Sequence, residues 1–250
     1  MLLRFILLLA LAATTRASGA TALVQEALAA EAERDAARAL TLFRQADAAR
    51  PDDAFILQKI ARQYSDLVED QPGVAAKKRF AQTALEYAQR AVALQPANAV
   101  NVLSLAVCHG KLALYSDNRT KVEYSRLVRE EAERALALDP DYAWAHHVLG
   151  RWHYEVASLG VASKFFVGFI YGGLPAASVA EGIRHLQRAT ELEPDELNHW
   201  LELGFACAAA GQPDRARAHW QRGLALPSRH TPDEPAKRRA REALARLDQN

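Results

Sequence analysis

Apolar and polar residues recur with a helical period along most of the chain. Ala and Leu return every three or four residues, and charged side chains fill the positions between them. This spacing gives each segment one apolar face, as in an amphipathic helix, and few stretches alternate as a strand does. Gly and Pro are sparse, with 12 and 10 copies in 250 residues, so the pattern predicts an all-α fold.

A proline that follows an Ala-rich helical stretch recurs along the chain and defines an internal repeat. These prolines are Pro51, Pro96, Pro140 and Pro194, and Pro227 follows the last of them by 33 residues. That spacing is close to the 34-residue period of tetratricopeptide repeats, each of which is a pair of helices. The earlier spacings of 45, 44 and 54 residues indicate the same unit with insertions.

Small residues keep one register relative to these prolines, which a generic amphipathic helix would not do. About ten residues after each proline stands a bulky residue followed by a small one: Ile60-Ala61, Leu105-Ala106, Leu149-Gly150 and Leu203-Gly204. The sequence therefore predicts a tetratricopeptide-type α-solenoid. We expect a right-handed superhelix of helix pairs that end near residues 50, 95, 139, 193 and 226.

The insertions predict enlarged repeats within one domain. Each lengthens a helix or adds a short one between the first and second helices, and they span residues 66–77, 111–121 and 158–177. A basic helix at 234–247 has no following unit, which suits a solvated capping helix. Because one repeat cannot bury its own apolar face, we expect residues 21–250 to form a single solenoid. Residues 21–49 form either one bent helix or two.

The first twenty residues are typical of a secretory signal. Arg4 supplies a positive charge, residues 5–13 form an apolar core too short to span a bilayer, and small residues at 17–20 offer a cleavage site. The alternative is an uncleaved N-terminal helix. No cysteine follows, as a lipoprotein anchor would need, and no other apolar run reaches the ~18 residues of a membrane span. We therefore expect an exported, periplasmic protein.

Charge and cysteine content narrow the partners and the covalent chemistry. Without residues 1–20, the 31 basic residues become 29 against 30 acidic ones, so the formal charge of +1 becomes −1. A nearly neutral protein has no bulk attraction to nucleic acid. Cys108 and Cys207 fall on equivalent helices two repeats apart. Because bridged Cα atoms must lie within about 7 Å, we expect two buried free thiols.

Certain positions on the first helices of such repeats line the concave wall of the solenoid, at spacings near i, i+3, i+7 and i+10 or i+11. An apolar lining with a few placed polar groups is the usual make-up of a binding pocket. These positions predict a groove for a ligand or partner, lined by Phe55, Arg62, Leu103, Val107, Lys111, Trp144, His147, Arg151, Tyr154, Leu201 and Phe205.

This groove would suit the end of a peptide or an anionic amphiphile. An acyl chain or apolar side chains would lie on the residues Leu103, Val107, Leu201 and Phe205. A carboxylate or phosphate would pair with Arg151 or Arg62 through two parallel hydrogen bonds. The alternative is that Arg151 pairs with Glu155 four residues later and only stabilises its own helix.

Neither a metal site nor a catalytic site is expected. His146, His147 and His153 invite a metal interpretation, but zinc needs three or four ligands in defined geometry, so we interpret them as packing or groove-lining residues. The sequence has no Gly-rich phosphate loop, no G-x-S-x-G turn and no H-E-x-x-H motif. The chain is therefore predicted to be non-enzymatic and to need no cofactor.

One segment carries a more specific likeness. Ala145–Ala157 (AHHVLGRWHYEVA) contains His-His-x-Leu-Gly-Arg-Trp and is followed by an aromatic insert that ends at Pro175, and then by Leu192-Glu193-Pro194. These motifs and the enlarged repeats resemble the regulator of microtubule dynamics family. The likeness covers most of residues 35–227 in architecture and is sharp over about 145–195.

The resemblance implies a helical, non-enzymatic protein. Eukaryotic members associate with microtubules or mitochondria, and the mitochondrial tether among them resembles a lipid-transfer module that holds phospholipid. This chain differs at its N-terminus, where a secretory signal stands in place of a membrane anchor and a coiled coil. An exported member is not expected to meet microtubules.

Two functions follow as hypotheses. The first is an adaptor that binds a protein or peptide partner in the groove. The alternative is a carrier of a phospholipid or another acyl ligand, enclosed under the aromatic insert at residues 161–175. That insert is a lid, a buried packing helix or a membrane contact.

Overall fold

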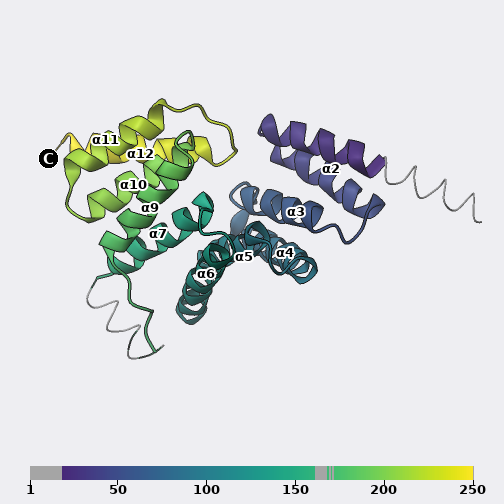
Figure 1. Cartoon of the computed structure of the whole chain (residues 1–250), viewed down its shortest axis with the longest axis horizontal. Helices are drawn as coiled ribbons and strands as arrows, with labels where there is room; N and C mark the ends of the chain where they lie inside the picture. The colour runs from purple at the N-terminus through teal and green to yellow at the C-terminus, as the bar shows by residue number, and fades with distance from the viewer. Residues whose placement is uncertain (1–18, 161–167, 169, 171, 250) are drawn as a thin grey trace, which may run out of the picture. The chain divides into compact units, whose positions relative to one another are not determined.

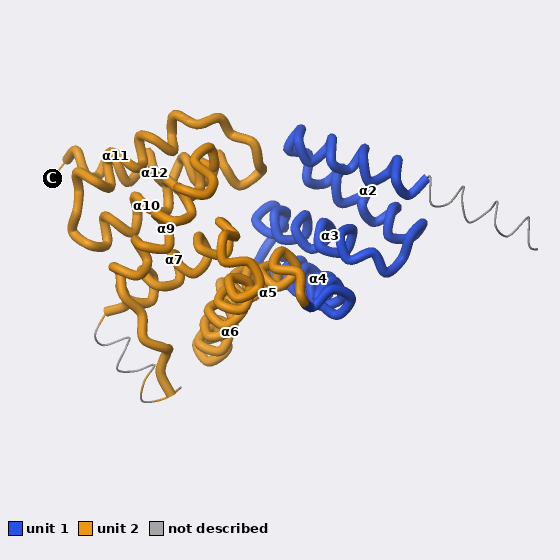
Figure 2. Tube along the Cα trace, viewed as in Figure 1, with its two compact units in different colours: residues 1–96 blue, residues 97–250 orange. Residues whose placement is uncertain are grey.

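The computed structural model describes residues 19–160, 168, 170 and 172–249, and within these residues the backbone forms helices and turns but no strand. The all-α prediction is therefore confirmed. Contacts between Cα atoms divide the chain into two compact units, Met1–Pro96 and Ala97–Asn250 (Figure 2). The expectation of one continuous domain over residues 21–250 stays a prediction.

Unit 1 begins with a helix over residues 19–32, followed by α2 (Ala36–Ala49), α3 (Ala54–Asp66) and α4 (Gly73–Leu94). A turn at Arg34, whose φ is 63°, separates the first helix from α2. Asp35 then caps α2, because its side chain accepts a hydrogen bond from the backbone N–H of Arg38. Residues 21–49 therefore form two helices.

Unit 2 repeats a helix pair. Its helices are α5 (Ala99–Ala113), α6 (Asn118–Leu138), α7 (Ala143–Ala157), α9 (Val179–Leu192), α10 (Leu197–Ala209), α11 (Pro213–Ala225) and α12 (Asp233–Leu247). The pairs α5/α6, α7/α9 and α10/α11 pack tightly, and the first helices α5, α7, α10 and α12 contact one another in that order (Figure 1). This is the arrangement of a tetratricopeptide-type solenoid.

The recurring proline ends the second helices through the residue before it. The ring of a proline disfavours the α conformation of the preceding residue. Accordingly Arg50, Gln95, Asp139 and Glu193 leave the helix with φ between −130° and −141° and ψ between 74° and 96°. The helices before them end at Ala49, Leu94, Leu138 and Leu192.

The residues that follow the recurring proline also begin the next helix. Two residues after the proline, the side chains of Asp53, Asn98 and Glu196 accept hydrogen bonds from N–H groups in the first turns of α3, α5 and α10. Tyr142 holds this place before α7 and makes no such side-chain bond. A proline followed by a short polar acceptor thus encodes the end of one helix and the start of the next.

Glycines allow the close approach of paired helices. A Cβ atom on Gly150 of α7 would lie 2.9 Å from the backbone oxygen of Gly182 on α9, and one on Gly204 of α10 would overlap the ring of Trp220. The insertions lengthen second helices, because α4 and α6 have 22 and 21 residues. Most of the insert at 161–175 lies outside the described residues.

None of the helices within the described ranges is both long and apolar enough to cross a membrane. The predicted signal at residues 1–20 lies almost entirely outside those ranges. Export therefore stays a prediction.

Candidate partner-binding face

The predicted groove residues divide between the two units. Phe55 and Arg62 belong to α3 of unit 1, where Phe55 is 47% exposed. Arg62 lies 3.5 Å from Glu31 and 3.8 Å from Asp66, so carboxylates flank its guanidinium. The other nine belong to unit 2, on the side formed by α5, α7, α10 and α12, which we call the first-helix face.

Four of these nine residues are buried: His147 and Tyr154 are 8% and 7% exposed, and two leucines belong to the core. Leu103 and Leu201 are only 4% and 1% exposed, so they offer no surface to an acyl chain. Leu201 fills the space over Gly223 of α11, where a Cβ would lie 2.5 Å from Leu201 Cδ2. The sequence pattern assigned both to the wall because a step of one residue, about 100° around the helix, separates the ligand side from the packing side. Val107 remains accessible at 39%, and Lys111 is partly exposed.

A buried glutamate organises the centre of the face. Glu202 of α10 accepts a short hydrogen bond from the hydroxyl of Tyr154 on α7. One terminal nitrogen of Arg239, on α12, donates to both carboxylate oxygens at 2.8 and 3.0 Å. Nε of Arg151, on α7, lies 3.8 Å away. These four residues are named the Glu202 cluster, and they join three helices.

The charges within the Glu202 cluster stabilise one another. Burial alone would raise the pKa of Glu202, but the guanidiniums of Arg151 and Arg239 outweigh it and lower that pKa to about 2. The same carboxylate raises the pKa of Arg151. Burial, and then Glu202, raises the pKa of Tyr154. At neutral pH the cluster therefore holds an ionised carboxylate between two cations and a neutral phenol.

Arg151 has both contacts that the sequence suggested as alternatives. Its Nε donates to Glu155 at 2.8 Å, as expected for residues four apart on a helix. It also lies near Glu202, which sequence reasoning did not consider. Its side chain is 46% exposed, so part of the guanidinium remains available to a ligand.

Arg239 and Phe205 form the other edge of the cluster. The guanidinium carbon of Arg239 lies 3.7 Å from the ring centroid of Phe205, which is a cation–π contact. The capping helix α12 was expected to be simply solvated. Instead Lys237 is buried and donates to the carbonyl of Leu226, while Arg239 points to Glu202. The helix is therefore part of the face.

An imidazole pair lies beside the cluster. Nδ1 of His147 and Nδ1 of His199 are 3.0 Å apart, and the ring of Trp144 contacts both. Burial, followed by His199, lowers the pKa of His147 to about 3. Nε2 of His199 lies 3.4 Å from Glu193, but it is buried and makes no hydrogen bond with the residues that the structure describes. One of the two Nδ1 atoms donates to the other.

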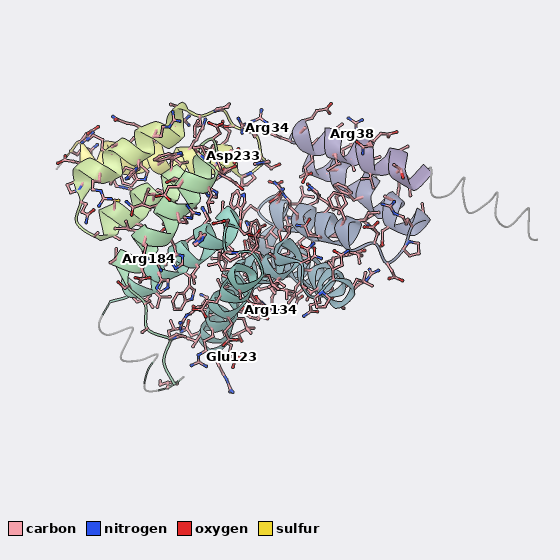
Figure 3. The ribbon with its side chains drawn as sticks, in the orientation of Figure 1. Arg34, Arg38, Glu123, Arg134, Arg184 and Asp233 are labelled. Carbon is pink, nitrogen blue, oxygen red and sulfur yellow. The ribbon has the colours of Figure 1, made fainter. Side chains whose placement is uncertain are left out.

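A second imidazole pair joins α7 to α9. Arg184 donates to Nε2 of His185, whose Nδ1 lies 2.8 Å from Nδ1 of His146, and Nε2 of His146 lies 3.0 Å from the carbonyl of Pro140. Every ring nitrogen is satisfied if His185 donates to His146 and His146 donates to Pro140. Figure 3 labels Arg184, the first donor in this series of hydrogen bonds.

The histidines that invited a metal interpretation therefore serve helix contacts. His153 stacks on His185, with ring centroids 5.8 Å apart. Within the part of the chain that the structure describes, no three His, Cys, Asp or Glu side chains are grouped so as to hold a metal ion.

Sequence reasoning missed Glu202, Arg239 and His199. One signal was present, because Glu202 is the single acidic residue in the largely apolar helix Leu197–Ala209. A lone acid on a buried helix needs a cationic or donor partner. The sequence did not show that the partner stands 37 residues later, on α12.

The sequence of this chain is similar to those of known proteins. Regulator of microtubule dynamics protein 3 of Xenopus laevis is 29% identical over 164 residues, which are 66% of this chain and 35% of that protein. Regulator of microtubule dynamics protein 2 of Homo sapiens is 24% identical over 197 residues, 78% of this chain and 48% of that protein. The chain thus matches less than half the length of either relative.

A solved structure supports the fold. A thermophilic tetratricopeptide repeat protein of Thermus thermophilus superposes with a TM-score of 0.66 and 20% identity, over 90% of this chain and 99% of that one. The sequence model described as "Regulator of microtubule dynamics protein 1-3" matches residues 23–248. The chain therefore belongs to the regulator of microtubule dynamics protein 1-3 family.

Proposed function

We propose that this protein is a non-enzymatic adaptor that holds a peptide segment of a protein partner on the first-helix face of unit 2. The tetratricopeptide-like fold and the family both fit a protein-interaction adaptor. The proposal includes export to the periplasm, and it includes no role at microtubules, which an exported protein does not meet.

The observation that carries the proposal is an exposed apolar strip beside fixed polar groups. Val100 and Val107, seven residues apart on α5, are 42% and 39% exposed, although their helix is otherwise packed. Arg151 stands at the corresponding place on the neighbouring helix α7. An apolar surface next to a few oriented donors is what peptide recognition requires.

Photo-crosslinking in cells tests the adaptor function. A photoreactive residue at Val107 is expected to capture a defined set of proteins, and Val100→Asp should reduce that capture at least fivefold because it places a charge on the apolar strip. Leu138→Asp is the matched control, since Leu138 is 40% exposed at the end of the second helix α6. Capture that is equal in both variants would contradict the proposal.

Native mass spectrometry separates the adaptor from the lipid carrier. If the protein is an adaptor, its mass after purification from its own host is expected to equal that of the polypeptide alone. A stoichiometric mass increment of a phospholipid, removed by organic extraction, would favour the carrier instead.

A further inference from the structure

We infer that the Glu202 cluster holds the carboxylate of an acidic side chain in the bound peptide. The inference rests on the function proposed above and names the chemistry of its ligand. The cluster presents two arginines side by side, and both keep donors that the fold does not use.

The unused donors can be counted atom by atom. Arg151 donates through Nε to Glu155, and Arg239 donates through one terminal nitrogen to Glu202. Within the described ranges, no hydrogen bond reaches either terminal nitrogen of Arg151 or Nε of Arg239. Their side chains are 46% and 40% exposed. The two terminal nitrogens of Arg151 can therefore meet a carboxylate in a two-point contact, and Nε of Arg239 adds one further donor.

The fold has already ordered both guanidiniums. The buried Glu202 accepts hydrogen bonds from Arg239, and the ring of Phe205 packs against the guanidinium of Arg239. A ligand therefore does not bear the full entropic cost of ordering two long side chains. Glu155 on Arg151 is itself 50% exposed, so a ligand carboxylate can take its place. Because the cluster carries a net charge of only +1, we expect selectivity for a carboxylate of about five- to tenfold, weakened by salt.

The spacing of neighbouring helices sets the expected distance between the acidic residue of the bound peptide and the residue that contacts the apolar strip. Val107 and Arg151 both stand eleven residues after their prolines, on the neighbouring helices α5 and α7. Packed helices lie about 8–10 Å apart. An extended peptide advances about 3.3 Å per residue. An apolar side chain three residues from the acid therefore reaches Val107.

A peptide array tests the inference with the purified protein. The array carries octapeptides with one Leu and one Asp at separations of one to six residues, each beside its Asn counterpart, and all with blocked ends. Binding is expected to peak at a separation of three and to fall about five- to tenfold when Asp becomes Asn. Arg239→Gln should abolish the preference for Asp, whereas Arg238→Gln, on the exposed neighbour, should keep it.

Further variants keep the outcome interpretable. Arg239→Lys retains the charge beside Glu202, so it should still unfold in one cooperative transition yet lose most of the preference. Equal binding of Asp and Asn peptides that Val100→Asp still weakens would overturn this inference and leave the adaptor function intact. No binding of any peptide, or binding that Val100→Asp does not change, would overturn both.

Discussion

Buried polar side chains in unit 2 are arranged so that their charges and protons have one favoured pattern. Glu202 is ionised between two arginines, and burial lowers the pKa values of His146, His147 and His185. Unpaired buried charge is costly, so such groups tie stability to pH.

The imidazole pairs predict a loss of stability on mild acidification. The pKa of His147 is about 3 and, through burial and then Arg184, that of His185 is about 4, against 6.5 for a free imidazole. Below pH 6.5 the unfolded chain binds protons that the folded chain does not, so the free energy of unfolding falls as the pH falls toward 4. At pH 5 His147 and His185 each cost on the order of 2 kcal/mol relative to pH 7.5.

Urea unfolding at pH 7.5 and pH 5.0 measures this effect. Glu202 does not interfere at pH 5, because its stabilisation is lost only as the pH falls from about 4.3, its unfolded value, toward 2. His147→Gln should make the free energy of unfolding depend less steeply on pH between 7.5 and 5.0, because one of the buried imidazoles is removed. An unfolding free energy that is equal at the two pH values would refute the assignment of neutral, buried imidazoles.

At the scale of the element, the sequence predicted helix ends better than it predicted side-chain contacts. A proline acts on the residue directly before it, so the ends after Ala49 and Leu94 follow from local sterics. The partners of Glu202 come from helices distant in sequence, and no local rule selects Arg239. Leu201 was assigned to the wrong side of its helix because a helical register is set by packing, not by period alone.

Glycine at the contact of α7 with α9 yields a prediction about one helix pair. Gly150→Ala places a methyl group 2.9 Å from the backbone oxygen of Gly182, which a rotamer change cannot relieve. We expect the free energy of unfolding to fall by about 1–3 kcal/mol, despite the better helix propensity of Ala. Gly160→Ala is the control, because no atom of the residues that the structure describes lies within 4 Å of a Cβ there. Equal urea midpoints for the two variants would show that the helices separate easily.

At the scale of the whole molecule, the titrating and fluorescent side chains are unevenly distributed. All eight His and all four Trp residues lie after residue 96, in unit 2. Tryptophan fluorescence therefore reports unit 2, whereas far-ultraviolet circular dichroism reports the helices of both units.

These two signals test whether the units unfold independently. At pH 5 the fluorescence midpoint in urea should drop below the midpoint from circular dichroism, because unit 1 has no histidine to destabilise it. At pH 7.5 the two should lie closer together. Coincident midpoints at both pH values would instead support one cooperative solenoid over residues 21–250.

The two buried cysteines of unit 2 can report the transient opening of its helices. Cys108 and Cys207 are 1% and 0% exposed on α5 and α10, and burial raises the pKa of Cys207, which disfavours the reactive thiolate. An alkylating reagent can modify them only in molecules whose helices have come apart. The alkylation rate of each cysteine, measured by mass spectrometry, therefore reports how often its helix opens transiently. No engineered label is needed.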